Sequence, residues 1–135
     1  MDGVILTPLK QIRNPKGDIF HAMKKSDDGY DGFGEAYFST INKGDIKGWK
    51  KHSSMSMNLV VPLGEIEFVV YDENKNDFFS TKLSKNNYQR LTVRAGLWMA
   101  FRGIEDINML LNIANLEHDP SEAVNLILEE IHYEW

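Results

Sequence analysis

The stretch from Lys43 to Asp72 reads KGDIKGWKKHSSMSMNLVVPLGEIEFVVYD, and the rest of the chain is organised around it. Its first part carries lysines and one histidine, and its second part is rich in Val, Ile and Phe on both sides of a glycine turn. Such residues at nearly every position are typical of strands in a sandwich core. We therefore predict strands over 58–63 and 65–72, paired around the Pro62-Leu63-Gly64 turn and preceded by a polar segment.

Turn signals recur about every eight to twelve residues through most of the chain, a rhythm that indicates an all-β sandwich or barrel. Asn14-Pro15-Lys16-Gly17 is one such turn, and the glycine-rich segment 24–34 predicts a loop. Residues 107–114 are compatible with a strand or a helix, and their context favours a strand. The other expected strands cover 4–6, 19–23, 35–41, 46–51, 78–83 and 88–93, with an aromatic-rich segment at 97–101.

The C-terminal end carries a helix start signal. Asp119 stands at a capping position, Pro120 at the first helical position and Glu122 in the first turn. Apolar residues then recur between Val124 and Ile131 and provide a core face. We predict a short helix over 121–131.

The bulk composition is that of one ordinary globular domain spanning residues 1–135. The chain has 135 residues, 42% hydrophobic and 26% charged, with a net charge of −5 and a pI near 5.3. That charge argues against general affinity for nucleic acid, which requires clustered Lys and Arg. The chain has no cysteine and no run of eighteen apolar residues, so we expect a cytoplasmic protein without a membrane span.

The order of motifs resembles the dTDP-4-dehydrorhamnose 3,5-epimerase family over nearly the whole chain. Its N-terminal pattern is matched by Val4, Pro8, Lys16-Gly17 and Phe20-His21, and its Arg-Gly-Leu-His-x-Gln hexamer by Lys47-Gly48-Trp49-Lys50-Lys51-His52. Later matches are Asn58-Leu59-Val60, Gly64-Glu65, the segment from Leu83 to Asn87, the segment from Arg94 to Phe101, and the end from Pro120 to Trp135.

This resemblance implies a cupin-type double-stranded β-helix, or jelly roll, that acts on a nucleotide-diphosphate 4-keto-6-deoxy sugar. The implied reaction is proton transfer next to the ketone, on a route to surface polysaccharide. The implied partners are the nucleotide sugar, with dTDP as the expected nucleotide, and a second copy of the chain in a homodimer. No cofactor is implied.

The family's catalytic positions carry other residues in this chain. The histidine that acts as general base falls on Lys50, and the lysine that stabilises the enolate falls near Asn58. The tyrosine that acts as acid falls near Leu111, and a later histidine falls on Met99. We therefore expect either catalysis by other groups or a relative that binds a sugar nucleotide or a partner protein without turnover. A lyase or isomerase acting on a different small molecule in the same pocket is a third possibility.

Lys50 and His52 are the two candidate bases. A lysine acts as a base only where burial or neighbouring cations lower its pKa by about three units; otherwise Lys50 is solvated or binds the diphosphate. Histidine titrates near neutral pH, so His52 is the alternative base, although a lone histidine is more often structural. Both side chains of an i, i+2 pair on a strand share one face.

Substrate binding is assigned to residues within the family motifs or to cations suited to a diphosphate. The aromatic side chains of Trp49 and Trp98 lie either in the pocket or in the core. No His-x-His pair of the kind common among metal-binding cupins occurs, and we predict no metal site. The predicted binding residues are Arg13, Lys16, Lys47, Trp49, Asn58, Trp98 and Arg102.

Overall fold

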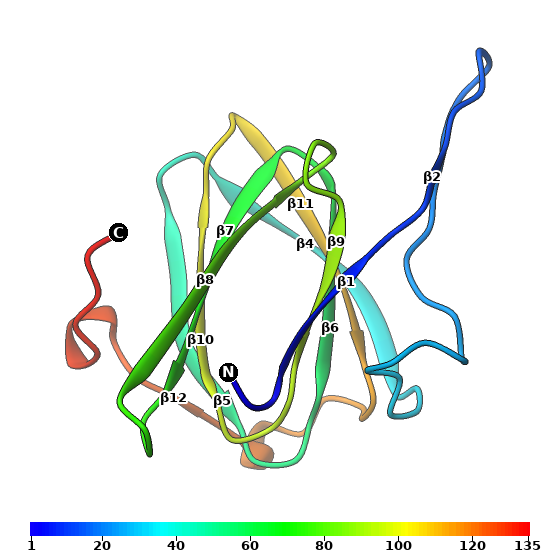
Figure 1. Cartoon of the computed structure of the whole chain (residues 1–135). Coiled ribbons are helices and arrows are strands. Elements are labelled where there is room, and N and C mark those ends of the chain that lie inside the picture. Colours follow the sequence, from blue (N-terminus) through cyan, green and yellow to red (C-terminus); the bar gives the residue numbers. More distant parts are fainter.

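The computed structural model describes all residues, 1–135, and shows two five-stranded antiparallel sheets packed face to face (Figure 1). The order in the first sheet is β1 (Val4–Pro8), β9 (Gln89–Val93), β6 (Met57–Leu63), β11 (Ile107–Ala114) and β4 (Glu35–Asn42). The order in the second is β12 (Ala123–Asn125), β5 (Ile46–His52), β10 (Trp98–Gly103), β7 (Glu65–Asp72) and β8 (Asp77–Ser84). The predicted all-β cupin-type jelly roll is confirmed.

The strands on both sides of Gly64 are confirmed, but their predicted pairing with each other is wrong. β6 pairs with β9 and β11 in the first sheet, whereas β7 pairs with β8 and β10 in the second. The chain therefore crosses from one sheet to the other at Gly64. A side chain at Gly64 would collide with the backbone of Ile107 and Asn108, so the crossing requires glycine.

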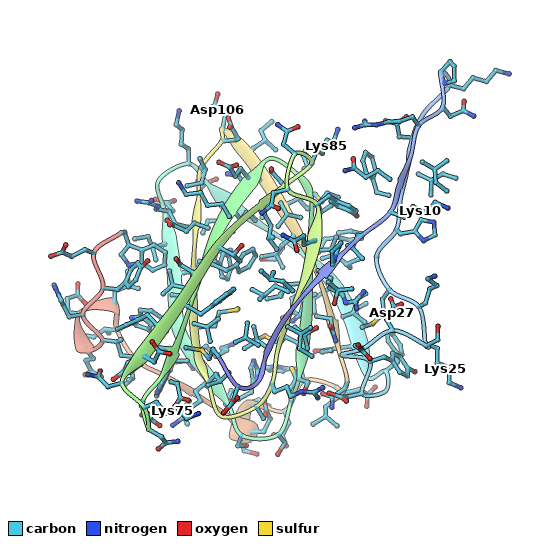
Figure 2. All side chains as sticks on the ribbon, viewed as in Figure 1. Lys10, Lys25, Asp27, Lys75, Lys85 and Asp106 are labelled. Carbon is cyan, nitrogen blue, oxygen red and sulfur yellow. The ribbon has the colours of Figure 1, made fainter.

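The main core fills the space between the sheets (Figure 2). It consists of alternate residues of the facing strands, including Leu59 and Val61 of β6, Phe68 and Val70 of β7, and Leu91 of β9. This alternation is the period of two that buries one side of each strand. Neighbouring residues of the same strands consequently face outward, and this separation decides which side chains reach the cavity described below.

The predicted C-terminal helix over 121–131 is wrong. Pro120–Glu122 forms one 3-10 turn, Ala123–Asn125 forms β12, and Leu128–Glu130 forms a second 3-10 turn. The capping signal is real, because the Asp119 carboxylate accepts from the Ser121 N–H at 3.0 Å. The chain then extends because β12 completes the edge of β5, and the edge pairing satisfies backbone groups that a helix would leave unpaired on β5.

The tail after β12 covers the outer face of the second sheet (Figure 1). Trp49 and Trp98 are buried there in a small second core with Ile131, and Tyr133 and Trp135 pack against it. The Trp49 indole N–H also donates to the Leu128 carbonyl at 3.3 Å. Both tryptophans therefore serve as an anchor for the tail.

A hairpin of β2 (Gln11–Ile12) and β3 (Ile19–Phe20) forms an arm that reaches away from the sandwich (Figure 1). Its tip is the predicted Asn14-Pro15-Lys16-Gly17 turn, and β3 is shorter than the expected strand over 19–23. The predicted loop 24–34 then returns the chain to β4. No helix in the structure is long and apolar enough to cross a membrane.

Candidate functional site

A cavity of about 310 Å³ opens between the two sheets. Its apolar lining residues are Met57, Leu59, Met99, Phe101 and Leu110, and the others are polar apart from Tyr37 and Gly48. The polar ones are Ser39, Lys47, Lys50, His52, Asn112 and Asn125. A pocket with apolar lining and convergent polar groups is the usual setting for a small-molecule site.

Strand β5 supplies the basic side chains of the cavity. Lys50 and His52 both line it, as the i, i+2 spacing predicts. Lys47 reaches the same face because the pairing of β5 with β10 contains a bulge, in which the step from Met99 to Phe101 spans three residues on β5. The bulge includes Gly48, where a Cβ would lie 2.3 Å from the Cβ of Ala100.

His52 is held by a carboxylate from the C-terminal segment. Its Nδ1 is hydrogen-bonded to Oε1 of Glu122, and each side chain is only 11% exposed. The other carboxylate oxygen, Oε2, accepts from the backbone N–H groups of Ser54 at 3.1 Å and Met55 at 3.2 Å. The carboxylate is thus fixed at both oxygens, and it fixes the orientation of the imidazole.

Glu122 is held in its charged form. Burial raises the pKa of Glu122, but the hydrogen bonds from His52 and from the N–H groups of Ser54 and Met55 outweigh it, so the pKa lies below its ordinary value. An ionised carboxylate only accepts hydrogen bonds, so Nδ1 of His52 carries a proton and donates it. In the neutral ring, Nε2 is then the unprotonated nitrogen, and this is the tautomer of a general base.

The first sheet supplies polar groups to the opposite wall of the cavity. Tyr37 and Ser39 project from β4, and Asn112 projects from β11. Asn112 is 1% exposed and donates through Nδ2 to the Tyr37 hydroxyl oxygen at 3.0 Å. The cavity therefore has an imidazole on one wall and a phenol on the other.

The remaining predicted binding residues lie outside the cavity. Trp49, Trp98 and Arg102 are on the outer face of the second sheet, where Arg102 pairs with Glu67 at 2.7 Å. Strand alternation places them there, because the cavity-facing residues of β10 are Met99 and Phe101.

Asn58 faces the outer side of the first sheet. Its Oδ1 accepts from Thr92 at 2.6 Å and from Arg90 at 3.2 Å, and its Nδ2 donates to the Gly29 carbonyl at 2.9 Å. These bonds attach the loop 24–34 to the sheet. Asn58 is thus placed among groups that hold the loop rather than at the cavity.

Arg13 and Lys16 lie on the arm. Arg13 pairs with Asp18 at 2.9 Å, and its side chain is 71% exposed. Nothing in the isolated chain brings these two cations to the cavity.

Sequence reasoning did not identify Glu122, which contacts His52, or the cavity residues Tyr37 and Asn112 as site residues. Glu122 was assigned to a helix turn, yet it stands 70 positions from His52 and meets it only through the pairing of β12 with β5. Tyr37 and Asn112 are likewise cross-strand partners from β4 and β11. No local spacing could have indicated either pair, since both depend on sheet register. No group of three or more histidine, cysteine or carboxylate side chains in the structure is arranged so that it could hold a metal ion.

No protein-family model matches the sequence, and neither does any curated protein. Solved structures do match. A dTDP sugar isomerase from Desulfovibrio desulfuricans G20 superposes with a TM-score of 0.93 at 26% identity, over 99% of this chain and 91% of that one.

Two further structures share the fold at lower identity. The 3,4-ketoisomerase QdtA from Thermoanaerobacterium thermosaccharolyticum, a variant solved with TDP-4-keto-6-deoxyglucose, matches at 18% identity and a TM-score of 0.80, over 92% of this chain and 88% of that one. The dTDP-6-deoxy-D-glucose-3,5-epimerase RmlC from Legionella pneumophila Philadelphia 1 was solved with dTDP-4-keto-L-rhamnose. It matches at 16% identity and a TM-score of 0.83, over 96% of this chain and 76% of that one. The chain thus has the RmlC-like cupin fold that dTDP-4-keto-6-deoxy sugar epimerases and isomerases share.

Proposed function

We propose that this protein removes a proton from the carbon next to the ketone of a nucleotide-diphosphate 4-keto-6-deoxy sugar, with His52 as the general base. The observation that carries the proposal is the His52–Glu122 pair at the wall of the cavity. A carboxylate that fixes one ring nitrogen prepares the other to accept a proton. Fold neighbours that hold 4-keto sugars support the substrate class.

Lys50, the other candidate base, is assigned to substrate binding. It is exposed at the cavity and so lacks the burial that the role of a lysine base requires. Lys47 lies near it and donates to the Thr40 carbonyl at 2.7 Å. Together they provide positive charge for a diphosphate, while the apolar residues of the lining suit the methyl group of a 6-deoxy sugar.

Two reactions begin with this proton transfer. Epimerisation returns a proton to the same carbon, and ketoisomerisation returns it to the neighbouring one. Structural similarity supports keeping the second candidate, because the dTDP sugar isomerase matches this chain with a TM-score of 0.93 at 26% identity.

The test is incubation with dTDP-4-keto-6-deoxyglucose in D2O, followed by proton NMR. We expect deuterium to enter at C3. Additional deuterium at C5 would indicate a 3,5-epimerase, and a new 3-keto product would indicate an isomerase. His52→Asn is expected to lower the exchange rate by about 10²–10⁴-fold. Binding of the nucleotide sugar without exchange above the buffer rate would instead identify a binding protein of the same fold.

We also propose a homodimer. The arm is a two-stranded hairpin, and such hairpins are marginally stable by themselves in water. Its apolar side chains Ile12 and Ile19 are 36% and 55% exposed. A second copy of the chain is the partner that we propose for the arm. Packing against it would bury these side chains and would place Arg13 and Lys16 of one copy close to the other copy.

A further inference from the structure

Strand β12 contributes one side chain to the lining of the cavity, that of Asn125. The register places Asn125 directly opposite Lys50 of β5, and Lys50 lies opposite Met99 of β10. All three side chains line the cavity, so they form one row across three neighbouring strands. The row begins with a neutral amide at the edge of the sheet, continues with an ammonium group and ends with an apolar thioether.

The two faces of β12 carry the reverse of the usual pattern. A strand of a sandwich normally turns its apolar side chains inward and its polar side chains to solvent. In β12 the apolar Val124 lies on the outer face and is 52% exposed, whereas the polar Asn125 faces the cavity. Departures of this kind from the rules of stable folding are expected at functional sites. The cavity wall thus carries an amide where packing alone would favour an apolar residue.

Asn125 also lies near His52. Ala123 is opposite His52 in the register, and Asn125 is two residues further along β12, so it faces the same side. The Cα atoms of such diagonal neighbours on adjacent strands are about 7–8 Å apart. Asn125 is therefore directly beside Lys50 and diagonal to His52.

These positions match the order of atoms in the proposed substrate. C1 of the sugar carries the diphosphate, for which Lys50 provides positive charge, and C3 is the carbon from which His52 would remove the proton. C2 lies between C1 and C3 and carries a hydroxyl group. A hydroxyl both donates and accepts hydrogen bonds, and a carboxamide does the same in either orientation of its amide.

We infer that Asn125 binds the C2 hydroxyl of the sugar and makes the protein selective for 2-hydroxy over 2-deoxy sugars. The inference rests on the proposed function and defines its substrate class more closely, as 4-keto-6-deoxy sugars that retain the C2 hydroxyl. A 2-deoxy sugar presents a methylene group to Asn125. The amide then loses its bonds to water on binding and gains no partner, which lowers the affinity for that sugar.

Titration calorimetry with three ligands measures this selectivity: dTDP-4-keto-6-deoxyglucose, its 2-deoxy analogue, and dTDP. All titrations use a His52→Asn background, so that the sugars are not converted during the measurement. With Asn125 in place, the 2-hydroxy sugar should bind about tenfold more tightly than the 2-deoxy sugar. Asn125→Ala and Asn125→Leu should each abolish this preference by weakening the binding of the 2-hydroxy sugar, and should leave the affinity for dTDP within about twofold.

The matched control is Val124→Ala, which changes the neighbouring residue of β12 on the opposite face. It should keep the tenfold preference. A merely structural role of Asn125 would instead lower the melting temperature and weaken the binding of both sugars equally, and the preference would survive.

The results separate the role of Asn125 from the proposed function. A preference that persists in both Asn125 variants, or no preference with Asn125 in place, overturns the role of Asn125, while the proposed function is decided by deuterium exchange at C3. The expected preference without exchange in the wild-type protein overturns the proposed proton transfer and leaves the role of Asn125 standing. Failure to bind either sugar overturns both.

Discussion

Glu122 holds His52 across 70 positions of the chain, by a bond between its Oε1 and the imidazole Nδ1. The contact exists because β12 pairs with β5 and places Ala123 opposite His52. The C-terminal segment is therefore part of the candidate site as well as a cover for the second sheet.

Glu122→Gln should lower the rate of deuterium exchange by roughly 10²-fold while leaving the affinity for dTDP within about twofold. The neutral amide can still contact Nδ1, but it stabilises the protonated ring less and permits the other tautomer. Exchange is measured by NMR and affinity by titration calorimetry. The control is Glu129→Gln, which lies in the tail but away from His52. A parallel loss of affinity in Glu122→Gln would mean that Glu122 shapes the cavity as a whole.

Glu122 should also make stability depend on acid pH. Because its folded-state pKa is depressed, its contribution is fully present above the unfolded-state value, near about pH 4.3, and is lost as pH falls through the lower folded-state pKa. Chemical unfolding measured from pH 6 to pH 3 should show that the free energy of unfolding falls less steeply in Glu122→Gln than in the wild-type protein. Identical slopes in both proteins would show that Glu122 does not contribute to acid unfolding.

The two cavity lysines should contribute to binding of the diphosphate. We expect Lys47→Met and Lys50→Met each to weaken dTDP binding by roughly tenfold, about 1.4 kcal/mol, and more so at low salt because the interaction is electrostatic. Lys75→Met is the control, since Lys75 pairs with Asp2 and does not line the cavity (Figure 2). Calorimetry at two salt concentrations provides the measurement, and equal affinity in all three variants would place the diphosphate elsewhere.

Strand positions, the all-β sandwich and the shared face of Lys50 and His52 could be predicted from the sequence, because they depend on local period and turn chemistry. The jelly roll was implied by the family resemblance. The partner of each strand could not be predicted in the same way. β6 and β7 are adjacent in sequence but lie in different sheets, and the acidic start after Asp119 continues as a strand because β5 has an open edge there. Lys47 enters the cavity only through the bulge at Gly48. Glu122 and Asn112 could be recognised as partners of His52 and Tyr37 only from the register of the paired strands.

Asn58 should contribute to the stability of the fold and not to ligand binding in the cavity. Asn58→Ala leaves the Arg90 Nε and the Gly29 carbonyl without their partner, and buried groups of this kind cost about 1–3 kcal/mol each when unpaired. We expect a lower melting temperature and faster proteolysis in the loop 24–34, with dTDP affinity unchanged. A loss of affinity at unchanged stability would return Asn58 to the binding site.

The arm should be required for assembly. Replacing residues 11–20 by a short glycine-serine link removes both arm strands but leaves the sandwich core intact, since the core contains none of these residues. Light scattering after gel filtration should then change from the mass of a dimer to that of the 15.5 kDa chain. The milder variant Ile12→Ser/Ile19→Ser should weaken the dimer without changing the melting temperature of the monomer. An intact dimer in both variants would mean that another surface joins the two copies, and a monomeric wild-type protein would remove the proposed assembly.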